Sequence, residues 1–73
     1  MPERRPEYPR ERVERELRAL LASDRWQSGD QLPSVPDLSV ELRAGHGTVR
    51  AVLAKLAEQG LVTVLPRYGT FKA

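Results

Sequence analysis

Apolar residues recur at helical spacing in the first third of the chain, after Pro9. They fall at i, i+4, i+7 and i+8, as Val13, Leu17, Leu20 and Leu21. This stripe predicts an amphipathic helix, and proline suits the first turn of such a helix because its missing N–H would have no partner there. The segment 23–33 contains Gly and Pro and ends the helix, and Trp26 within it is expected to fill the core.

A second, shorter helix is predicted to begin at Ser34. Ser34 and Asp37 have the spacing of a capping box, in which the hydroxyl accepts from a backbone N–H three residues on and the carboxylate reaches back. Leu38 and Leu42 then form its inward edge at i and i+4. The break at 43–46 follows, where Gly45 can both turn the chain and cap the next helix.

The third stretch has the strongest periodicity and predicts a helix over about 46–59. Its apolar positions recur at i, i+3, i+4 and i+7, as Val49, Val52, Leu53 and Leu56. Gly60 stands where a left-handed C-terminal cap is expected. On a helical wheel the opposite face consists of Gly47, Ala51, Ala54 and Glu58, with Arg50 on one flank.

The chain ends in a predicted hairpin. Residues 61–65 are rich in β-branched side chains and are expected to form the first strand. Residues 66–69 contain residues typical of a turn, and residues 70–72 are expected to form the second strand. The fold class is therefore mainly α with small β: three helices plus a C-terminal two-stranded wing over about 61–72, a winged helix-turn-helix. The pattern also allows a third short strand near Gln31 and Leu32.

Composition limits what this chain can do. Its 73 residues suffice for one small soluble domain, expected over 8–73, and the proline-rich, charged residues 1–7 are expected to form a flexible arm. One His and no Cys leave no tetrahedral metal site, and no cofactor is expected. No paired carboxylates, nucleophile with a base, or phosphate-binding Gly loop argues for an enzyme. No signal peptide or membrane span is visible, so a cytoplasmic location is expected.

Charge is distributed unevenly. Residues 1–41 hold seven Arg against nine acidic residues, whereas residues 42–73 hold five Arg or Lys against one acidic residue. The basic C-terminal half favours an anionic partner, with nucleic acid first.

Six sequence pieces, in order, resemble the DNA-binding domain of the GntR family of bacterial transcriptional regulators over about residues 8–72. They are Gly29-Asp30-Gln31-Leu32-Pro33-Ser34, Thr48-Val49-Arg50, Leu53, Leu56, Gly60-Leu61-Val62 and Gly69-Thr70-Phe71. The resemblance implies sequence-specific binding of double-stranded DNA, with the helix about 46–59 in the major groove and the wing on the minor groove or phosphates. The expected partners are duplex DNA and a second copy on DNA, with no membrane and no effector domain in this chain.

Arg50 is the leading candidate for a base contact, because its guanidinium can pair with guanine O6 and N7 or with a phosphate. Thr48 can reach a phosphate or a thymine methyl, and Arg67 at the wing tip can enter a narrow minor groove. The full set of expected DNA-contacting residues is Ser34, Arg43, His46, Gly47, Thr48, Arg50, Lys55, Arg67, Tyr68 and Gly69.

Five positions depart from the family pattern. Gly45 and His46 stand where the family usually has Ser and Arg, and Pro36 replaces an Arg that binds DNA. Val35 replaces a Glu, and Arg67 stands where another Gly is common. These changes leave open an alternative: a winged-helix protein-interaction module that has lost DNA affinity. Whether the chain is a stand-alone regulator or an excised domain also stays open.

Overall fold

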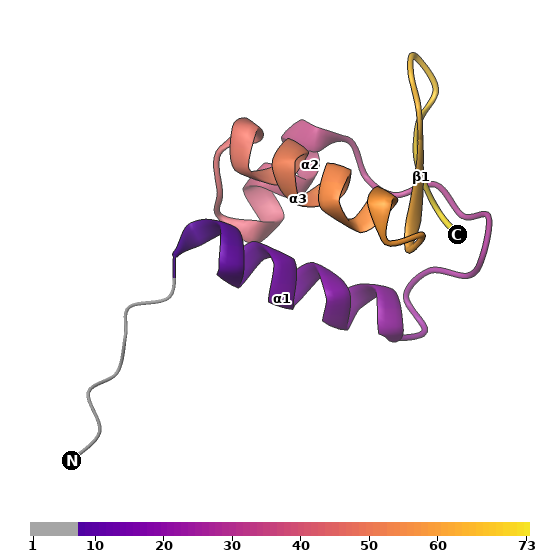
Figure 1. Ribbon diagram of the computed structural model, residues 1–73, viewed down its shortest axis with the longest axis horizontal. Coiled ribbons are helices and arrows are strands. Elements are labelled where there is room, and N and C mark those ends of the chain that lie inside the picture. The colour runs from indigo at the N-terminus through magenta and orange to yellow at the C-terminus, as the bar shows by residue number, and fades with distance from the viewer. Residues whose placement is uncertain (1–7) are drawn as a thin grey trace.

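A computed structural model describes residues 8–73 and consists of three helices followed by a two-stranded hairpin (Figure 1). The elements are α1 (Pro9–Ala22), α2 (Val35–Leu42), α3 (His46–Glu58), β1 (Val62–Leu65) and β2 (Gly69–Lys72). This order confirms the predicted winged helix-turn-helix. The arm expected over residues 1–7 lies outside the described residues.

The helices enclose one apolar core, and the predicted stripes face it. In α1 the side chains of Val13, Leu17 and Leu21 are buried, while Leu20 is partly buried beside them. Trp26 is buried as expected. The buried apolar residues of the described chain are Val13, Leu17, Leu21, Trp26, Leu32, Leu38, Leu42, Val49, Val52, Leu53, Leu56 and Val62. Each large one stabilises the fold by about 1.5–3 kcal/mol relative to an exposed position.

The start of α2 differs in part from the prediction. The Ser34 hydroxyl accepts a hydrogen bond from the Asp37 N–H at 3.3 Å, as a cap does. The reciprocal half of the predicted capping box is wrong: among residues 8–73 the Asp37 carboxylate accepts no hydrogen bond from the Ser34 N–H. One cap satisfies one of the open N–H groups, and the proline in the first turn of α2 removes another.

The turn between α2 and α3 also differs from the prediction. Gly45 has φ −70°, an extended conformation, and serves only as the N-cap of α3. The left-handed residue that turns the chain is Arg43, with φ 53°. Its N–H bonds back to the Val40 carbonyl at 3.3 Å, and the Ala44 N–H to the Ser39 carbonyl at 3.0 Å. The chain therefore turns two residues earlier than glycine placement suggested.

The end of α3 follows the prediction. Gly60 has φ 76°, and its N–H bonds to the Ala57 carbonyl at 3.0 Å. The Leu61 N–H bonds to the Leu56 carbonyl at 2.9 Å, which completes a Schellman cap. The chain then enters β1 directly.

The wing is an antiparallel hairpin in which Val62 pairs with Lys72 and Leu65 with Gly69. It projects from the helical body (Figure 1). The third strand that the sequence allowed near residues 31–32 is present as a single bridge between Gln31 and Phe71. The strand β2 is thus paired on both of its edges, with β1 on one side and with residues 30–32 on the other.

Candidate nucleic-acid interface

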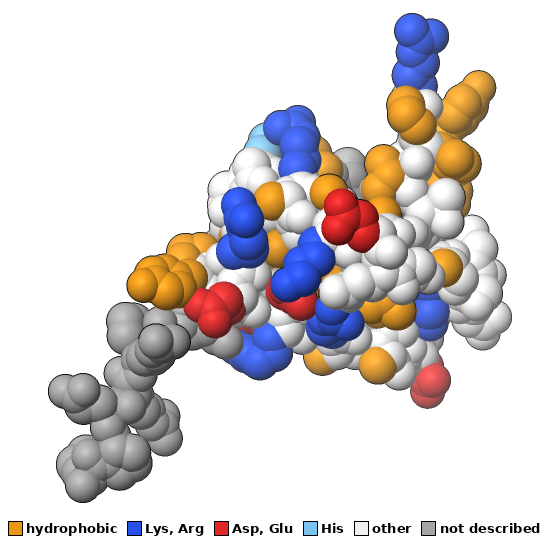
Figure 2. Space-filling view, in the orientation of Figure 1, with side chains coloured by type: hydrophobic (Ala, Val, Ile, Leu, Met, Phe, Trp, Pro, Cys, Tyr) orange, Lys and Arg blue, Asp and Glu red, His pale blue; other side chains and the backbone are white. Residues whose placement is uncertain are grey.

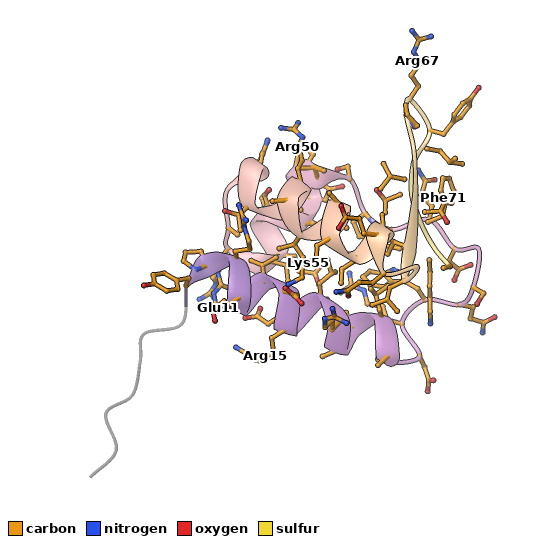
Figure 3. The ribbon with its side chains drawn as sticks, viewed as in Figure 1. Glu11, Arg15, Arg50, Lys55, Arg67 and Phe71 are labelled. Carbon is orange, nitrogen blue, oxygen red and sulfur yellow. The ribbon has the colours of Figure 1, made fainter. Side chains whose placement is uncertain are left out.

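The outer face of α3 carries small residues and one arginine. Gly47 and Ala54 are exposed, whereas Ala51 is half-buried, contrary to the helical wheel, because α3 is packed by α1, α2 and β1. Arg50 is exposed, and its guanidinium extends away from the helical body (Figure 3). Small neighbours allow the backbone of such a helix to approach base edges in a groove about 12 Å wide.

The N-terminus of α3 adds hydrogen-bond donors next to Arg50. The first helical bond runs from the Val49 N–H to the Gly45 carbonyl at 3.1 Å, so the preceding N–H groups have no partner within the helix. His46 is exposed and Thr48 is half-buried at this end. Backbone donors and the helix dipole together favour an anion there.

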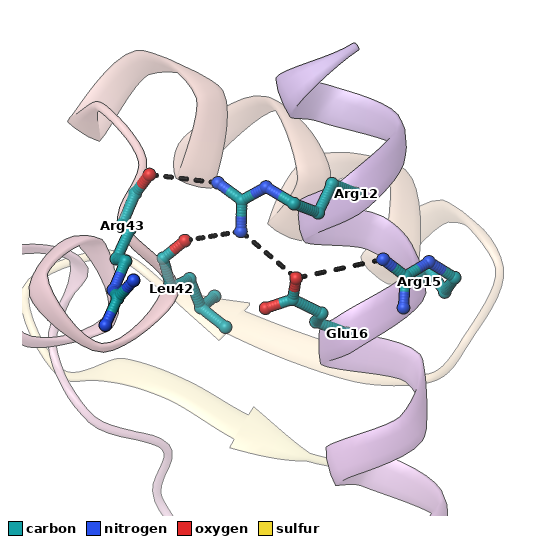
Figure 4. Close-up of polar contacts among 5 residues, drawn as sticks. All are labelled: Arg12, Arg15, Glu16, Leu42 and Arg43. Carbon is teal, nitrogen blue, oxygen red and sulfur yellow. Dashed lines mark hydrogen bonds and ion pairs between the residues drawn. The ribbon is translucent and has the colours of Figure 1, made fainter. Parts of the chain in front are cut away.

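A cross-chain contact from α1 holds the turn before α3. The Arg12 guanidinium donates to the Leu42 carbonyl at 2.7 Å and to the Arg43 carbonyl at 2.9 Å (Figure 4). Glu16, one turn along α1, accepts from the same guanidinium at 3.1 Å. Arg12 therefore satisfies carbonyls at the C-terminus of α2, and the exposed Arg43 side chain projects from a fixed backbone.

The wing tip is a tight turn with Arg67 at its apex. The Tyr68 N–H bonds to the Leu65 carbonyl at 3.0 Å, and Arg67 has φ 73°. Pro66 before a left-handed residue is the arrangement of a type II turn, which favours Gly at that residue. Arg67 thus adopts a backbone conformation that normally favours glycine. Its side chain extends furthest along the wing (Figure 3), and Tyr68 is 75% exposed rather than packed on the ribbon.

Lys55 has an intramolecular partner. Its ammonium donates to Glu14 Oε1 on α1 at 2.8 Å, while Arg18 donates to the other oxygen at 3.0 Å. These two hydrogen bonds lower the pKa of the Glu14 carboxyl below its ordinary value. Arg50 and Arg67 extend toward the same side of the molecule, whereas Lys55 lies toward α1 (Figure 3). The candidate interface therefore centres on Arg50 and Arg67.

An apolar hollow of about 670 Å³ separates α3 from the wing. Arg50 and Glu58 border it. Its lining consists otherwise of Val35, Leu53, Ala54, Ala57, Val64 and Thr70. Figure 2 shows basic side chains above α3 and at the wing tip, with hydrophobic side chains along the hairpin between them. The face that carries the two arginines is thus apolar at its centre, with basic side chains and the carboxylate of Glu58 around it.

Sequence reasoning missed two residues that position this face, Arg12 and Gln31. No sequence pattern marks Arg12, yet it bonds to carbonyls 30 and 31 residues away. The Gln31 amide donates to the Tyr68 carbonyl across 37 residues at 2.8 Å. Contacts from a side chain to a distant backbone leave no periodic signal in the sequence.

Among residues 8–73 there is no group of three or more side chains able to hold a metal ion. None of the described helices is long and apolar enough to cross a membrane.

Comparison with solved structures supports the fold. Three solved structures share the fold and each aligns with 100% of this chain. One is AraR(DBD) in complex with operator ORR3, at TM-score 0.90, 19% identity and 88% of that chain. The second is a GntR family transcriptional regulator from Listeria monocytogenes, at TM-score 0.83, 18% identity and 62% of that chain. The third is a transcriptional regulator from Oenococcus oeni, at TM-score 0.77, 25% identity and 59% of that chain.

Sequence comparison supplies the family. No curated protein sequence matches the chain significantly. The family model described as bacterial regulatory proteins, gntR family, matches residues 9–71, which is nearly the whole described chain. The chain belongs to the gntR family of bacterial regulatory proteins.

Proposed function

We propose that this chain binds double-stranded DNA sequence-specifically as the DNA-binding domain of a bacterial transcriptional regulator. In the proposal α3 enters the major groove, and the wing lies on the minor groove or on phosphates. One observation carries it: Arg50 of α3 and Arg67 of the wing are exposed on the same side, and neither has an acidic partner among residues 8–73. The family match and the operator complex of AraR(DBD) support it.

Arg50 is proposed to read a guanine or to bind a phosphate close to it. His46, Gly47 and Thr48, at the N-terminus of α3, are proposed to bind the phosphate backbone through side-chain and backbone donors. Recognition helices commonly insert their N-terminal residues in this way.

The flanking contacts are proposed to be less specific. Ser34 and Arg43, at the two ends of α2, are proposed to contact phosphates, and Tyr68 and Gly69 to lie beside Arg67 against the groove. Lys55 can contact a phosphate only if its ammonium releases Glu14, so its contribution to DNA affinity is expected to be small.

No catalytic role is proposed, and the cytoplasm, where bacterial DNA lies, is the proposed location. A single copy would contact one half-site, for which an affinity on the order of micromolar or weaker is expected. Binding of a second copy on adjacent DNA is the proposed route to tighter binding.

One observation favours a second candidate, a protein-interaction module. The apolar hollow between α3 and the wing lies on the same face as Arg50, and Val35 within it replaces an acidic residue of the family pattern. A protein partner would bury this apolar surface, whereas DNA would not need it.

Titration into labelled duplex DNA at several salt concentrations separates the two candidates. For a domain that contacts about four phosphates, the logarithm of the association constant should fall with the logarithm of the salt concentration at a slope of about −3.6. A flat salt dependence, or no duplex binding at low salt, would support the protein-interaction module instead.

Arg50→Ala is expected to weaken binding and to relax base preference, because a bidentate guanine contact supplies about 1–3 kcal/mol of discrimination. Arg15→Ala is the matched control: it removes the same charge from the other side of the molecule (Figure 3). Equal losses in the two variants would mean that Arg50 contributes only net charge, and the assignment of α3 as the reading helix would fail.

A further inference from the structure

The wing tip is held by a side chain from outside the hairpin. Gln31 Nε2 donates to the Tyr68 carbonyl at 2.8 Å. The same nitrogen lies 2.5 Å from the position that a Cβ on Gly69 would occupy. The amide therefore packs closely over the strand where β2 begins, in space that only glycine leaves open.

The backbone that carries this amide is itself fixed. Gln31 forms the bridge with Phe71, and the Leu32 N–H bonds to the Thr70 carbonyl at 2.8 Å. On the other side the Lys72 N–H bonds to the Asp30 carbonyl at 2.8 Å. The Gln31 side chain thus extends from a segment hydrogen-bonded to β2 on both sides of it.

The tip has little other support. Leu65 and Tyr68 are both exposed, and Arg67 adopts a left-handed conformation that residues with a Cβ rarely adopt. Within the turn, the Tyr68 N–H bonds to the Leu65 carbonyl. A tip with so few contacts would sample many directions unless something outside the hairpin restrained it.

We infer that Gln31 is a positioning residue for DNA binding: its amide fixes the direction of the wing tip and so presents Arg67 to the duplex. This inference rests on the proposed function. Gln31 need not touch DNA, because its effect passes through the Tyr68 carbonyl to the neighbouring Arg67. Orienting a cation before binding lowers the cost of ordering it in the complex.

A double-mutant cycle tests the inference. Gln31→Met keeps the length of the side chain but removes the donor, and it should weaken duplex binding about fivefold, the equivalent of one ordinary hydrogen bond. In an Arg67→Ala background the same change should have a much smaller effect, limited to the contacts of Tyr68 and Gly69. Gln27→Met is the control: it makes the same substitution in the same loop, where the side chain has no hydrogen bond within residues 8–73.

Backbone ¹⁵N relaxation of the DNA-free protein gives a second readout. In Gln31→Met the order parameters of residues 67–69 should fall from about 0.85 toward about 0.6, with helical residues unchanged. An equal loss of affinity in both backgrounds, or a tip as ordered as in the parent protein, would overturn the inference. If the parent protein binds no duplex, the proposed function fails instead, and the relaxation data still report whether Gln31 orders the tip.

Discussion

Two arginines in this chain occupy backbone conformations that normally favour glycine. Arg43 has φ 53° and Arg67 has φ 73°, and they are the only residues other than glycine with positive φ among residues 8–73. A side chain with a Cβ pays about 1–2 kcal/mol for this conformation. Both lie at corners that border the proposed interface, and strained residues concentrate where function requires a particular side chain. Arg67 is therefore expected to serve binding at the expense of stability.

Arg67→Gly separates these two effects. Relief of the left-handed penalty, about 1–2 kcal/mol, outweighs the added entropy of the unfolded chain, about 0.5–1 kcal/mol. The free energy of unfolding should rise by about 0.5–1 kcal/mol, while duplex affinity falls as far as it does in Arg67→Ala. Urea denaturation and DNA titration measure the two quantities. Arg67→Ala keeps the strained φ, so a stability gain in that variant as well would contradict this account.

At the scale of elements, the placement of α3 depends on α1 as well as on the turn between α2 and α3. Arg12 of α1 contacts this turn by donating to the Leu42 and Arg43 carbonyls where α2 ends. A helix terminus whose carbonyls lack partners loses stability. The same contact holds the backbone of Arg43, which is one of the proposed phosphate ligands. The Arg12 guanidinium therefore links the packing of α1 to the backbone of the proposed interface.

Arg12→Ala should lower the free energy of unfolding by about 1–3 kcal/mol, because it leaves two carbonyls without their charged donor. Arg15→Ala, on the same helix, removes an arginine that is 62% exposed at the side chain and should change stability by less than about 0.5 kcal/mol. Chemical denaturation of both variants checks the difference. Similar small effects in the two would mean that water replaces the Arg12 contacts without loss.

The sequence predicted the elements well and the contacts between them poorly. Periodic apolar residues located all three helices, and β-branched residues followed by turn chemistry located the wing. The turn at Arg43 was missed because Gly45 is the residue with the lower intrinsic cost for turning, and packing rather than propensity decided which one turns. Arg50 was placed correctly on the surface, whereas the partner of Lys55 depends on how α1 crosses α3, which no local pattern encodes.

At the scale of the whole molecule, some charged side chains are held in ion pairs and others are not. Glu14 binds Lys55 and Arg18, and Glu41 binds Arg25, so neither pairing includes Arg50 or Arg67. Hydrogen bonding to Arg25 lowers the pKa of Glu41, as Lys55 and Arg18 do for Glu14. Three of the eight acidic residues among residues 8–73, Glu14, Glu16 and Glu41, are thus paired with basic side chains. Arg50 and Arg67 have no ion pair among these residues and add a positive field on their own side.

These lowered pKa values give stability a pH dependence in acid. Because the folded carboxylates hold protons less tightly than the unfolded ones, their contribution is complete above the ordinary Glu pKa, about 4.3, and is lost as pH falls through the lower folded values. Urea midpoints measured from pH 7 to pH 2.5 should therefore fall below about pH 4. Glu41→Gln should make that fall shallower, whereas Glu58→Gln, whose carboxylate has no ion pair within residues 8–73, should not.

The pairing of Gln31 with Phe71 has a consequence for the shape of target that the domain can accept. Only Leu32 and Pro33 separate that bridge from the Ser34 cap of α2, so the hairpin base and the helix pair move as one body. The spacing between the two arginines is then set by the protein and not adjusted to the ligand. A duplex whose helical pitch is changed, by intercalation or by an A-form segment, should therefore be unable to satisfy both contacts at once.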